Sequence, residues 1–373
     1  MKDRIQPLDG LRMIAAFGVV WIHTWAAFGT PKLMIGPVDF YQAIAILGNG
    51  VDFFFVISGF CMYLMTANKK YSLSSYWQFL KKRFIRIAPA FYVAVLVYGV
   101  LKYCGDTSFP IWREMGLHFL FLNNFTGSSI SSPFWSIATE WNFYILLPLL
   151  VILNTRYDLG RSLLLISLAS VLFFCIVNFG LVNADFWQWQ IFVKFPEFAV
   201  GIFAAHLFKK GKNLPLIFSG WKGLFLAFTV MYVGRFLKFT SFVEWAGSFG
   251  FILKSIADTV MVIGFAIVLL HVITQPSMLS QFLSGKFVTW LGRISYSVYL
   301  WHSLVILLTG QYLINLPFPN FNVLFGFFSV CMITILISAV SYQLLESFYF
   351  RRRTQAEVTE LQEQELAVKK GGV

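Results

Sequence analysis

The sequence predicts an all-α integral membrane protein, a bundle of about ten transmembrane helices with both termini in the cytoplasm. Of its 373 residues, 58% are hydrophobic and only 12% are charged, a balance that a soluble domain of this size does not need. The apolar residues form runs of about 20 residues, the length that crosses a bilayer. The basic residues lie between alternate runs, as in cytoplasmic loops. The net charge of +12 therefore does not indicate nucleic-acid binding.

Ten apolar runs are long enough to span the membrane. They are residues 11–28, 42–66, 87–103, 133–153, 161–181, 189–208, 221–239, 250–273, 287–310 and 323–349. Most lysines and arginines outside these runs fall in loops that this order places in the cytoplasm. Residues 1–350 are thus expected to form one transmembrane domain, followed by a polar cytoplasmic tail at 351–373.

The segment from Asp106 to Ser132 contains a short apolar piece, Leu117 to Leu122. This piece is too short to span, and counting it as a span would invert every later loop, so we expect it to re-enter or to lie at the outer interface. Ser132 followed by Pro133 has the pattern of a helix N-cap with proline at the first helical position. The fourth span is therefore predicted to begin there. The four cysteines have no metal-like spacing, and no metal is expected.

Two ionisable residues interrupt the first apolar run, Arg12 at its start and His23 eleven residues later. On a helix they are separated by roughly 16 Å along the axis. A titratable imidazole inside a span is costly, so His23 is a candidate functional residue. The alternative is a structural histidine that is bonded to a neighbouring helix.

Two acidic residues inside spans are candidate partners for His23. Glu140 lies seven residues after Pro133, roughly 10 Å inside the outer end of its span, a depth similar to that of His23. We therefore expect Glu140 to orient the imidazole as a general base. Asp52 is a second acidic candidate. A hydrogen bond between helices remains the alternative for each carboxylate.

Two further pairs of charged residues are spaced to neutralise each other on one helix face. Lys194 and Glu197 lie at i and i+3, and Lys254 and Asp258 lie at i and i+4. Structural pairing is the favoured interpretation of both pairs.

Polar and aromatic residues in two later spans are candidate substrate contacts. Ser295, Tyr299 and His302 fall on one helix face, where they either line a cavity or tie helices together. Trp135 and Trp141 flank Glu140 in the fourth span and are expected to contact the substrate.

Three arginines are candidate ligands for phosphate groups. Arg83 and Arg86, at i and i+3, project in the same direction at the start of the third span, and Arg12 lies at the same membrane face. Guanidinium groups bind phosphates in a bidentate manner. The alternative is that they contact lipid headgroups.

Five short motifs occur in one order along the chain. They are Leu8-Asp9-Gly10-Leu11-Arg12 followed by His23; residues 50–60, GVDFFFVISGF; Arg83-x-x-Arg86-Ile87-x-Pro89; residues 134–141, FWSIATEW; and residues 294–302, ISYSVYLWH. In these motifs the chain resembles acyltransferase family 3, the bacterial integral-membrane acyltransferases that modify surface and secreted glycans. The resemblance covers the chain from the first span to the ninth.

This resemblance implies a fold of about ten helices in the bacterial cytoplasmic membrane. It implies an acyl-CoA donor, with acetyl-CoA favoured, and as acceptor a hydroxyl of an extracytoplasmic glycan or lipid-linked saccharide. His23 matches the essential histidine of the family, as a general base or an acyl acceptor, and Glu140 matches its acidic residue. Arg12, Arg83 and Arg86 match its donor-binding arginines.

Two other functions remain in competition. Ten spans with buried carboxylates and a histidine also describe a proton-coupled transporter or flippase for a glycan precursor. No inverted repeat supports that interpretation. A non-catalytic membrane subunit of a polysaccharide assembly complex is the third possibility.

Overall fold

The computed structural model describes residues 5–66, 73–125, 130–156, 158–211, 219–238, 240–313 and 322–348, almost all of them helical. The expected tail at 351–373 lies outside these residues. The long helices are α1 (Gln6–Ala27), α3 (Gly50–Thr66), α4 (Leu73–Gly105), α6 (Trp135–Arg156), α7 (Leu159–Asn178), α9 (Ile191–Lys209), α10 (Gly220–Phe236), α11 (Thr240–Thr274), α14 (Ser295–Leu313) and α15 (Asn322–Ser341).

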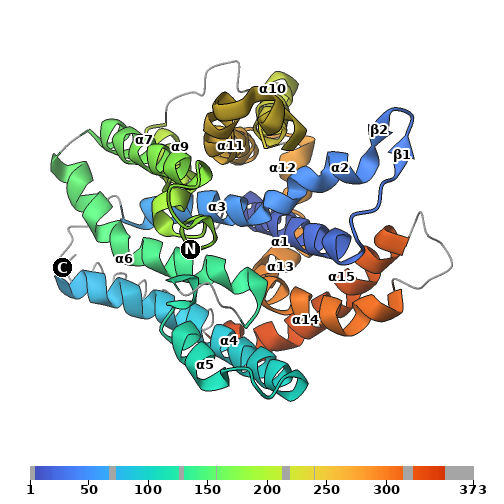
Figure 1. Ribbon diagram of the computed structural model, residues 1–373. Helices are drawn as coiled ribbons and strands as arrows, with labels where there is room; N and C mark the ends of the chain where they lie inside the picture. Colours follow the sequence, from blue (N-terminus) through green and yellow to red (C-terminus); the bar gives the residue numbers. More distant parts are fainter. Residues whose placement is uncertain are drawn as a thin grey trace.

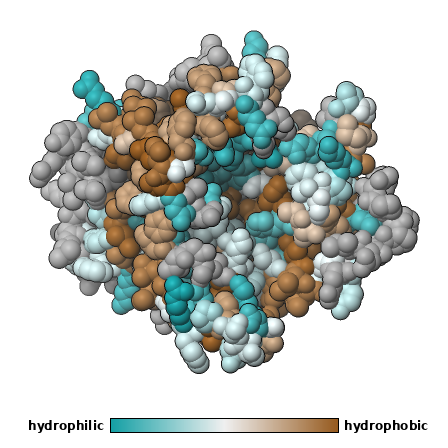
Figure 2. Space-filling view, viewed as in Figure 1, coloured by the Kyte–Doolittle hydropathy of each residue, from teal (hydrophilic) through white to brown (hydrophobic). Residues whose placement is uncertain are grey.

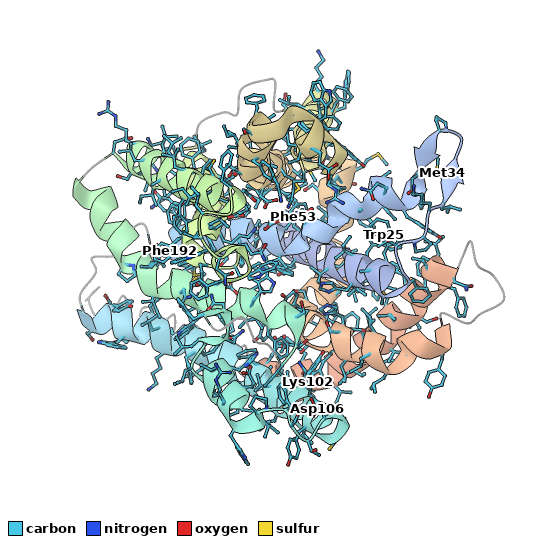
Figure 3. The ribbon with its side chains drawn as sticks, viewed as in Figure 1. Trp25, Met34, Phe53, Lys102, Asp106 and Phe192 are labelled. Atoms are coloured by element: carbon cyan, nitrogen blue, oxygen red, sulfur yellow. The ribbon has the colours of Figure 1, made fainter. Side chains whose placement is uncertain are left out.

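Shorter elements connect these helices. They are the strands β1 (Met34–Ile35) and β2 (Val38–Asp39), the helices α2 (Phe40–Ile44), α5 (Ile111–Phe119), α8 (Ala184–Trp187), α12 (Met278–Leu283) and α13 (Lys286–Arg293), the 3₁₀ turns η1 (Ala45–Asn49), η2 (Asn123–Phe125) and η3 (Ser132–Phe134), and a π-helical turn (Tyr342–Glu346). The two strands, which pair antiparallel, were not predicted from the sequence. They form a small hairpin that carries Met34 away from the bundle (Figure 3).

Seven helices of the described residues are long and apolar enough to cross a membrane, or up to eight if α13 and α14, which meet at a bend of 68°, form one span. The prediction of ten spans is therefore confirmed only in its coarse form, as an all-α membrane protein. The helices α6 and α10 occupy the fourth and seventh predicted runs, but α10 has only 17 residues. The orientation of the termini stays a prediction.

Several helix limits differ from the predicted runs. The second run corresponds to one candidate span, Phe40–Thr66, in which α2 and the 3₁₀ turn η1 lead directly into α3. The third helix already begins at Leu73 and has Pro89 inside it, since hydropathy marks only the apolar part of a helix that continues into polar sequence. The fourth helix begins at Trp135, after a 3₁₀ turn that contains Pro133. The predicted N-cap at Ser132 was therefore wrong.

The segment before the fourth span contains the nine-residue helix α5, which is about 13 Å long and too short to span. The apolar piece Leu117 to Leu122 is not a separate element, because α5 ends at Phe119 within it. Phe121 then takes a positive φ of 56°. Lys102 and Asp106, at the end of α4, lie on the same side of the bundle as this segment (Figure 3).

The centre of the bundle is formed by α1 and α3, with α10 and α11 on one side and α14 and α15 on another (Figure 1). Helices α3 and α9 touch backbone to backbone. A Cβ atom at Gly59 would collide with the carbonyl oxygen of Phe198, and one at Gly201 with that of Val56. Small residues permit this close approach of helices. Phe198 also stacks between Phe143 and Phe55, with ring centroids 4.1 and 4.5 Å away.

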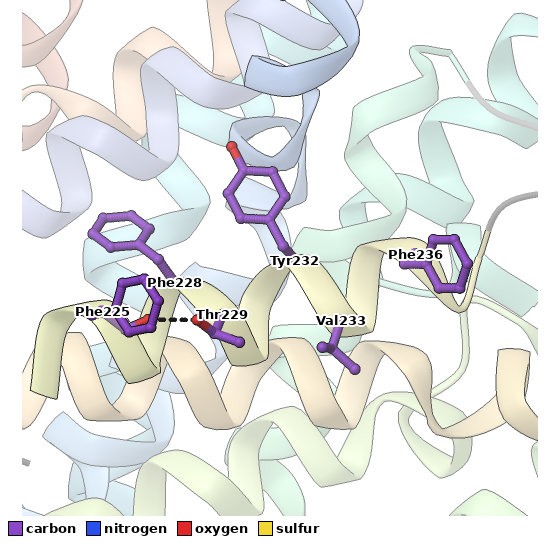
Figure 4. Close-up of a pocket in the computed structure, with 6 residues that line it drawn as sticks. All are labelled: Phe225, Phe228, Thr229, Tyr232, Val233 and Phe236. Carbon is purple, nitrogen blue, oxygen red and sulfur yellow. Dashed lines mark hydrogen bonds between the residues drawn. The ribbon is translucent and has the colours of Figure 1, made fainter. Parts of the chain in front are cut away.

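Apolar side chains cover much of the surface, as expected for helices that face lipid. On the face drawn in Figure 2, hydrophilic side chains gather around a hollow near its middle. A shallow groove of about 460 Å³ on α10 is lined by Phe225, Phe228, Thr229, Tyr232, Val233 and Phe236 (Figure 4). The Thr229 hydroxyl donates to the carbonyl of Phe225 in its own helix, so the groove presents an almost wholly apolar surface.

Candidate active site

Arg12 and His23 lie on one uninterrupted helix, α1 (Gln6–Ala27). The eleven steps of helical rise from Arg12 to His23 therefore correspond to about 16 Å along the axis, as predicted. Different polar groups gather at each position. We call the group around Arg12 the arginine cluster and the group around His23 the histidine pair.

The histidine pair consists of His23 on α1 and His302 on α14. The Nδ1 atom of His23 lies 2.8 Å from the Nε2 atom of His302. The two rings are nearly coplanar, with an interplanar angle of 5°. His302 is fully buried, whereas His23 is half-buried. The second ring nitrogen of His302, Nδ1, lies 2.7 Å from the carbonyl oxygen of Tyr299.

The side chain of Tyr299 connects this pair to α6. Its hydroxyl lies 2.6 Å from the Ser136 hydroxyl and donates to the Pro133 carbonyl at 2.5 Å. Of the predicted stripe on α14, His302 belongs to the histidine pair and Tyr299 contacts it, whereas Ser295 is buried at the start of the helix. Seven residues separate Ser295 from His302, or about 10 Å along the axis.

The arginine cluster is organised around Tyr144. Its hydroxyl donates to Glu140 Oε1 at 2.5 Å, and Ser58 Oγ donates to the same oxygen at 2.9 Å. The guanidinium carbon of Arg83 lies 5.9 Å from the centre of the Tyr144 ring, within the range of a cation–π contact. The guanidinium of Arg12 lies within electrostatic range of Tyr144.

The two remaining contacts of Arg12 come from its own helix and from α3. It donates to Asp9 Oδ1 at 3.0 Å and to Cys61 Sγ at 3.3 Å. Cys61 lies one turn after Ser58 on α3, so the partner of Arg12 and the partner of Glu140 share a helix face. This shared face places Glu140 near Arg12.

Arg86 reaches the same region from the next turn of α4. It lies within electrostatic range of Tyr296 and Glu346. Glu346 is buried in the π-helical turn and accepts a hydrogen bond of 2.5 Å from Ser297. The structure thus brings together the three arginines that the sequence analysis grouped.

The expected contact between Glu140 and His23 is absent from the described residues, and that prediction was wrong. Each residue has other partners. Glu140 lies one helical turn from Ser136, and the partner of Ser136, Tyr299, lies one turn from His302. The similar depths that were counted from the helix ends therefore did not predict which side chains meet.

The second acidic candidate, Asp52, belongs to a separate buried ion network. Lys194 Nζ lies 3.2 Å from Asp52, 3.2 Å from Glu197 and 3.5 Å from Asp258. The predicted pair of Lys194 and Glu197 is confirmed. The predicted pair of Lys254 and Asp258 is wrong. Asp258 instead pairs with Lys194 on α9 and with Lys238 in the turn after α10, the latter at 2.6 Å.

The two tryptophans of the fourth span lie in different surroundings. Trp135 packs against Trp189, with centroids 4.5 Å apart, and against Phe55. Trp141 stacks on Phe121 at 4.9 Å. Both side chains are half-buried, so each leaves part of its surface accessible.

Ser58 and Tyr144 were not among the site residues predicted from the sequence. Tyr144 follows Glu140 by four residues, so a hydroxyl at helical spacing from the carboxylate was the available signal. A pair on α5, Glu114 and His118, was also not predicted, and both side chains are fully buried. The Nδ1 atom of His118 lies 2.7 Å from the carbonyl oxygen of Glu114. Burial lowers the pKa of His118 because it disfavours the charged imidazole.

The chemistry available is that of an imidazole base and a cationic cluster. Among the described residues, no group of three or more histidine, cysteine or acidic side chains is arranged to hold a metal ion. His23 is half-buried and lies far along α1 from the guanidinium groups. The arrangement suits proton transfer at one position and anion binding at the other.

The comparison with protein families gives the same result as the five motifs. Residues 5–343 match the acyltransferase domain of acyltransferase family 3. The chain belongs to this family. The match contains every residue of the histidine pair and of the three arginines, and it ends inside the π-helical turn.

Curated relatives of this family are named O-acetyltransferases. The chain is 24% identical over 375 residues to O-acetyltransferase OatA of Staphylococcus aureus, a match that covers 91% of this chain and 56% of the relative. It is 25% identical over 387 residues to peptidoglycan O-acetyltransferase OatA of Listeria monocytogenes, with 93% and 56% covered. The chain thus spans about half the length of these relatives. No solved structure matches it.

Proposed function

We propose that this protein transfers an acetyl group from cytoplasmic acetyl-CoA to a hydroxyl group of a glycan outside the cytoplasmic membrane. The observation that supports this proposal is the arrangement on α1, where Arg12 of the arginine cluster and His23 of the histidine pair lie about 16 Å apart. That separation is comparable to the length of the pantetheine arm of coenzyme A. A donor whose phosphates bind at Arg12 would present its thioester at His23.

The arginine cluster suits the phosphate end of the donor. Arg12 and Arg86 are half-buried, and Arg83 is 6% exposed. Guanidinium groups bind phosphates through two parallel hydrogen bonds. The ring of Phe79, 5.5 Å from the guanidinium carbon of Arg83, and the ring of Tyr144 hold that fork in place. Glu140 serves this cluster by fixing the Tyr144 hydroxyl.

The histidine pair suits the chemical step. The acceptor hydroxyl gives its proton to His23 while its oxygen attacks the thioester carbonyl, so a carbon–oxygen bond forms and the carbon–sulfur bond breaks. The departing thiolate of coenzyme A then takes the proton from His23. Binding both substrates against one imidazole supplies the proximity contribution to the rate. A variant of this route passes the acetyl group through His23 itself.

The acceptor class follows from the relatives. One of them is named a peptidoglycan O-acetyltransferase, and a sugar hydroxyl is the acceptor that an O-acetyl ester requires. The half-buried Trp135 and Trp141 are suited to stack on sugar rings, because aromatic side chains combine an apolar face with a polar edge.

The test uses the full chain in lipid nanodiscs with radiolabelled acetyl-CoA and soluble peptidoglycan oligosaccharides. We expect label to appear in an ester that mild alkali releases from the oligosaccharide. His23→Ala and His23→Asn should both abolish ester formation, because an amide cannot accept the proton. His206→Asn is the matched control, since that imidazole contacts Tyr63 elsewhere in the bundle.

Ester formation by His23→Asn at the wild-type rate would overturn the assignment of His23. Absence of labelled ester with the wild-type protein would overturn the proposed reaction with this acceptor. The competing transporter function predicts a different result, in which sealed vesicles move an intact saccharide across the bilayer and no ester forms.

A further inference from the structure

We propose that His302 is a positioning residue that fixes the tautomer of His23, so that the Nε2 atom of His23 is the nitrogen that accepts the proton. This inference rests on the proposed function for its catalytic meaning, but its structural part does not depend on it. It assigns to a neutral imidazole the orienting role that the sequence analysis gave to Glu140.

The assignment begins at the backbone. A carbonyl oxygen only accepts hydrogen bonds, so the contact of 2.7 Å between His302 Nδ1 and the Tyr299 carbonyl requires a proton on Nδ1. In a neutral imidazole the other nitrogen then carries a lone pair and no proton. His302 Nε2 is therefore an acceptor.

The next contact transmits this constraint to α1. His302 Nε2 lies 2.8 Å from His23 Nδ1, and since Nε2 accepts, Nδ1 of His23 must donate. The Ser303 hydroxyl, 3.2 Å from the same Nε2, is also a donor and agrees with this assignment. A neutral His23 that is protonated on Nδ1 has its lone pair on Nε2. No protein group among the described residues bonds to that nitrogen.

The opposite direction of the bond would require a doubly protonated His302. That imidazolium would be fully buried, and among the described residues no carboxylate forms an ion pair with His302. Glu140 accepts hydrogen bonds from Ser58 and Tyr144 instead. An unpaired buried charge is costly. With both imidazoles neutral, His302 donates to the Tyr299 carbonyl and accepts from His23, so each N–H group in this series has an acceptor.

The consequence for catalysis is twofold. The coplanar rings, with an interplanar angle of 5°, hold the His23 imidazole in one orientation. When His23 becomes positively charged, its Nδ1–H remains bonded to the lone pair of His302. A neutral partner stabilises this charge less than the carboxylate of a serine-protease triad does, so the main contribution of His302 is orientation.

Two substitutions separate this role from a packing role. In His302→Gln the amide oxygen takes a place near the former Nε2 atom and can still accept from His23. In His302→Asn the shorter side chain keeps a donor near the Tyr299 carbonyl but offers no acceptor to His23. We expect the kcat for acetyl transfer to fall about 10- to 100-fold in His302→Asn, with a smaller loss in His302→Gln and little change in the KM for acetyl-CoA.

A direct measurement of the tautomer uses histidine labelled with nitrogen-15 and solid-state NMR of the protein in lipid. Assignment is practical because the chain has five histidines, and the His23→Asn spectrum identifies the His23 signals. In the wild type, Nδ1 of His23 should have the shift of a protonated ring nitrogen and Nε2 that of an unprotonated one. In His302→Asn this assignment should reverse or become mixed.

Each result decides one question. An unchanged His23 tautomer in His302→Asn, or a protonated Nε2 in the wild type, would overturn the proposal. Equal kcat in His302→Asn and the wild type would also overturn it. If the wild type transfers no acetyl group but shows the expected tautomer that depends on His302, the positioning relationship stands and the proposed function fails.

Discussion

The carboxylate of Asp52 lies 3.2 Å from the ammonium group of Lys194, and this ion pair joins α3 to α9. The same ammonium contacts Glu197 and Asp258, so one cation holds three carboxylates within the bundle. Lys194 is 7% exposed and Asp52 is 6% exposed. A buried charge of this kind is maintained only while its partners remain.

Replacement of Lys194 by Met should destabilise the protein strongly. It leaves three carboxylates without their shared cation, and removal of one partner from a buried ion pair costs about 3–5 kcal/mol. Thermal unfolding in detergent, followed by tryptophan fluorescence, measures the effect. Lys254→Met is the matched control, since Lys254 lies on α11 near Asp258 but Asp258 pairs with other lysines. Equal midpoints for the two variants would contradict this account.

Asp52→Asn should leave the kcat of the folded protein unchanged. The amide keeps the shape of the side chain and can still accept from Asn49, which now donates to Asp52 Oδ2 at 2.9 Å. We expect a lower unfolding midpoint with unchanged kcat per folded molecule, measured by radiolabelled acetyl transfer. Loss of kcat at full stability would return Asp52 to the set of catalytic candidates.

Arg83→Lys should weaken donor binding while the protein remains folded. Lysine keeps the charge but loses the planar fork and its contacts with Tyr144 and Phe79. Loss of one charged hydrogen bond, worth about 1.5–3 kcal/mol, corresponds to an increase in Kd of about 10- to 100-fold. Isothermal titration with a non-hydrolysable acetyl-CoA analogue tests this. Lys82→Ala, an exposed position on the same helix, should bind normally.

Glu140→Gln should change the binding of acetyl-CoA and leave proton transfer by His23 unchanged. The amide can keep the bonds from Ser58 and Tyr144 but removes a negative charge from the arginine cluster. We expect a changed KM for acetyl-CoA and an unchanged tautomer of His23. A normal KM combined with a loss of kcat as large as that of His302→Asn would support the discarded pairing of Glu140 with His23.

Gly59→Ala should destabilise the contact between α3 and α9. The added methyl group would meet the carbonyl oxygen of Phe198, a backbone atom that cannot move without its helix. Overpacking of this kind costs about 1–3 kcal/mol. Gly116→Ala on α5 is the control, because no heavy atom lies within 4 Å of its added Cβ. The unfolding midpoints of the two variants should differ clearly, and equal midpoints would contradict the close packing.

The sequence by itself determined the helical membrane fold, the separation of Arg12 from His23, and the grouping of the three arginines. These features are local, because helical rise and spacing fix distances within one helix, and hydropathy marks where a helix crosses a membrane. The family match covers residues 5–343, which contain all of these residues.

Only the tertiary structure decided which side chains from different helices meet. His302 lies 279 residues from His23 in the sequence, and Glu140 meets Ser58 across 82 residues. No periodicity within one helix specifies such pairs, because they depend on how far each helix is shifted along its axis relative to its neighbours. Close packing limits that shift; for example, a Cβ atom at Gly292, next to α14, would collide with the carbonyl oxygen of Asp9 on α1. The shift places Glu140 with the arginines and leaves His302 beside His23.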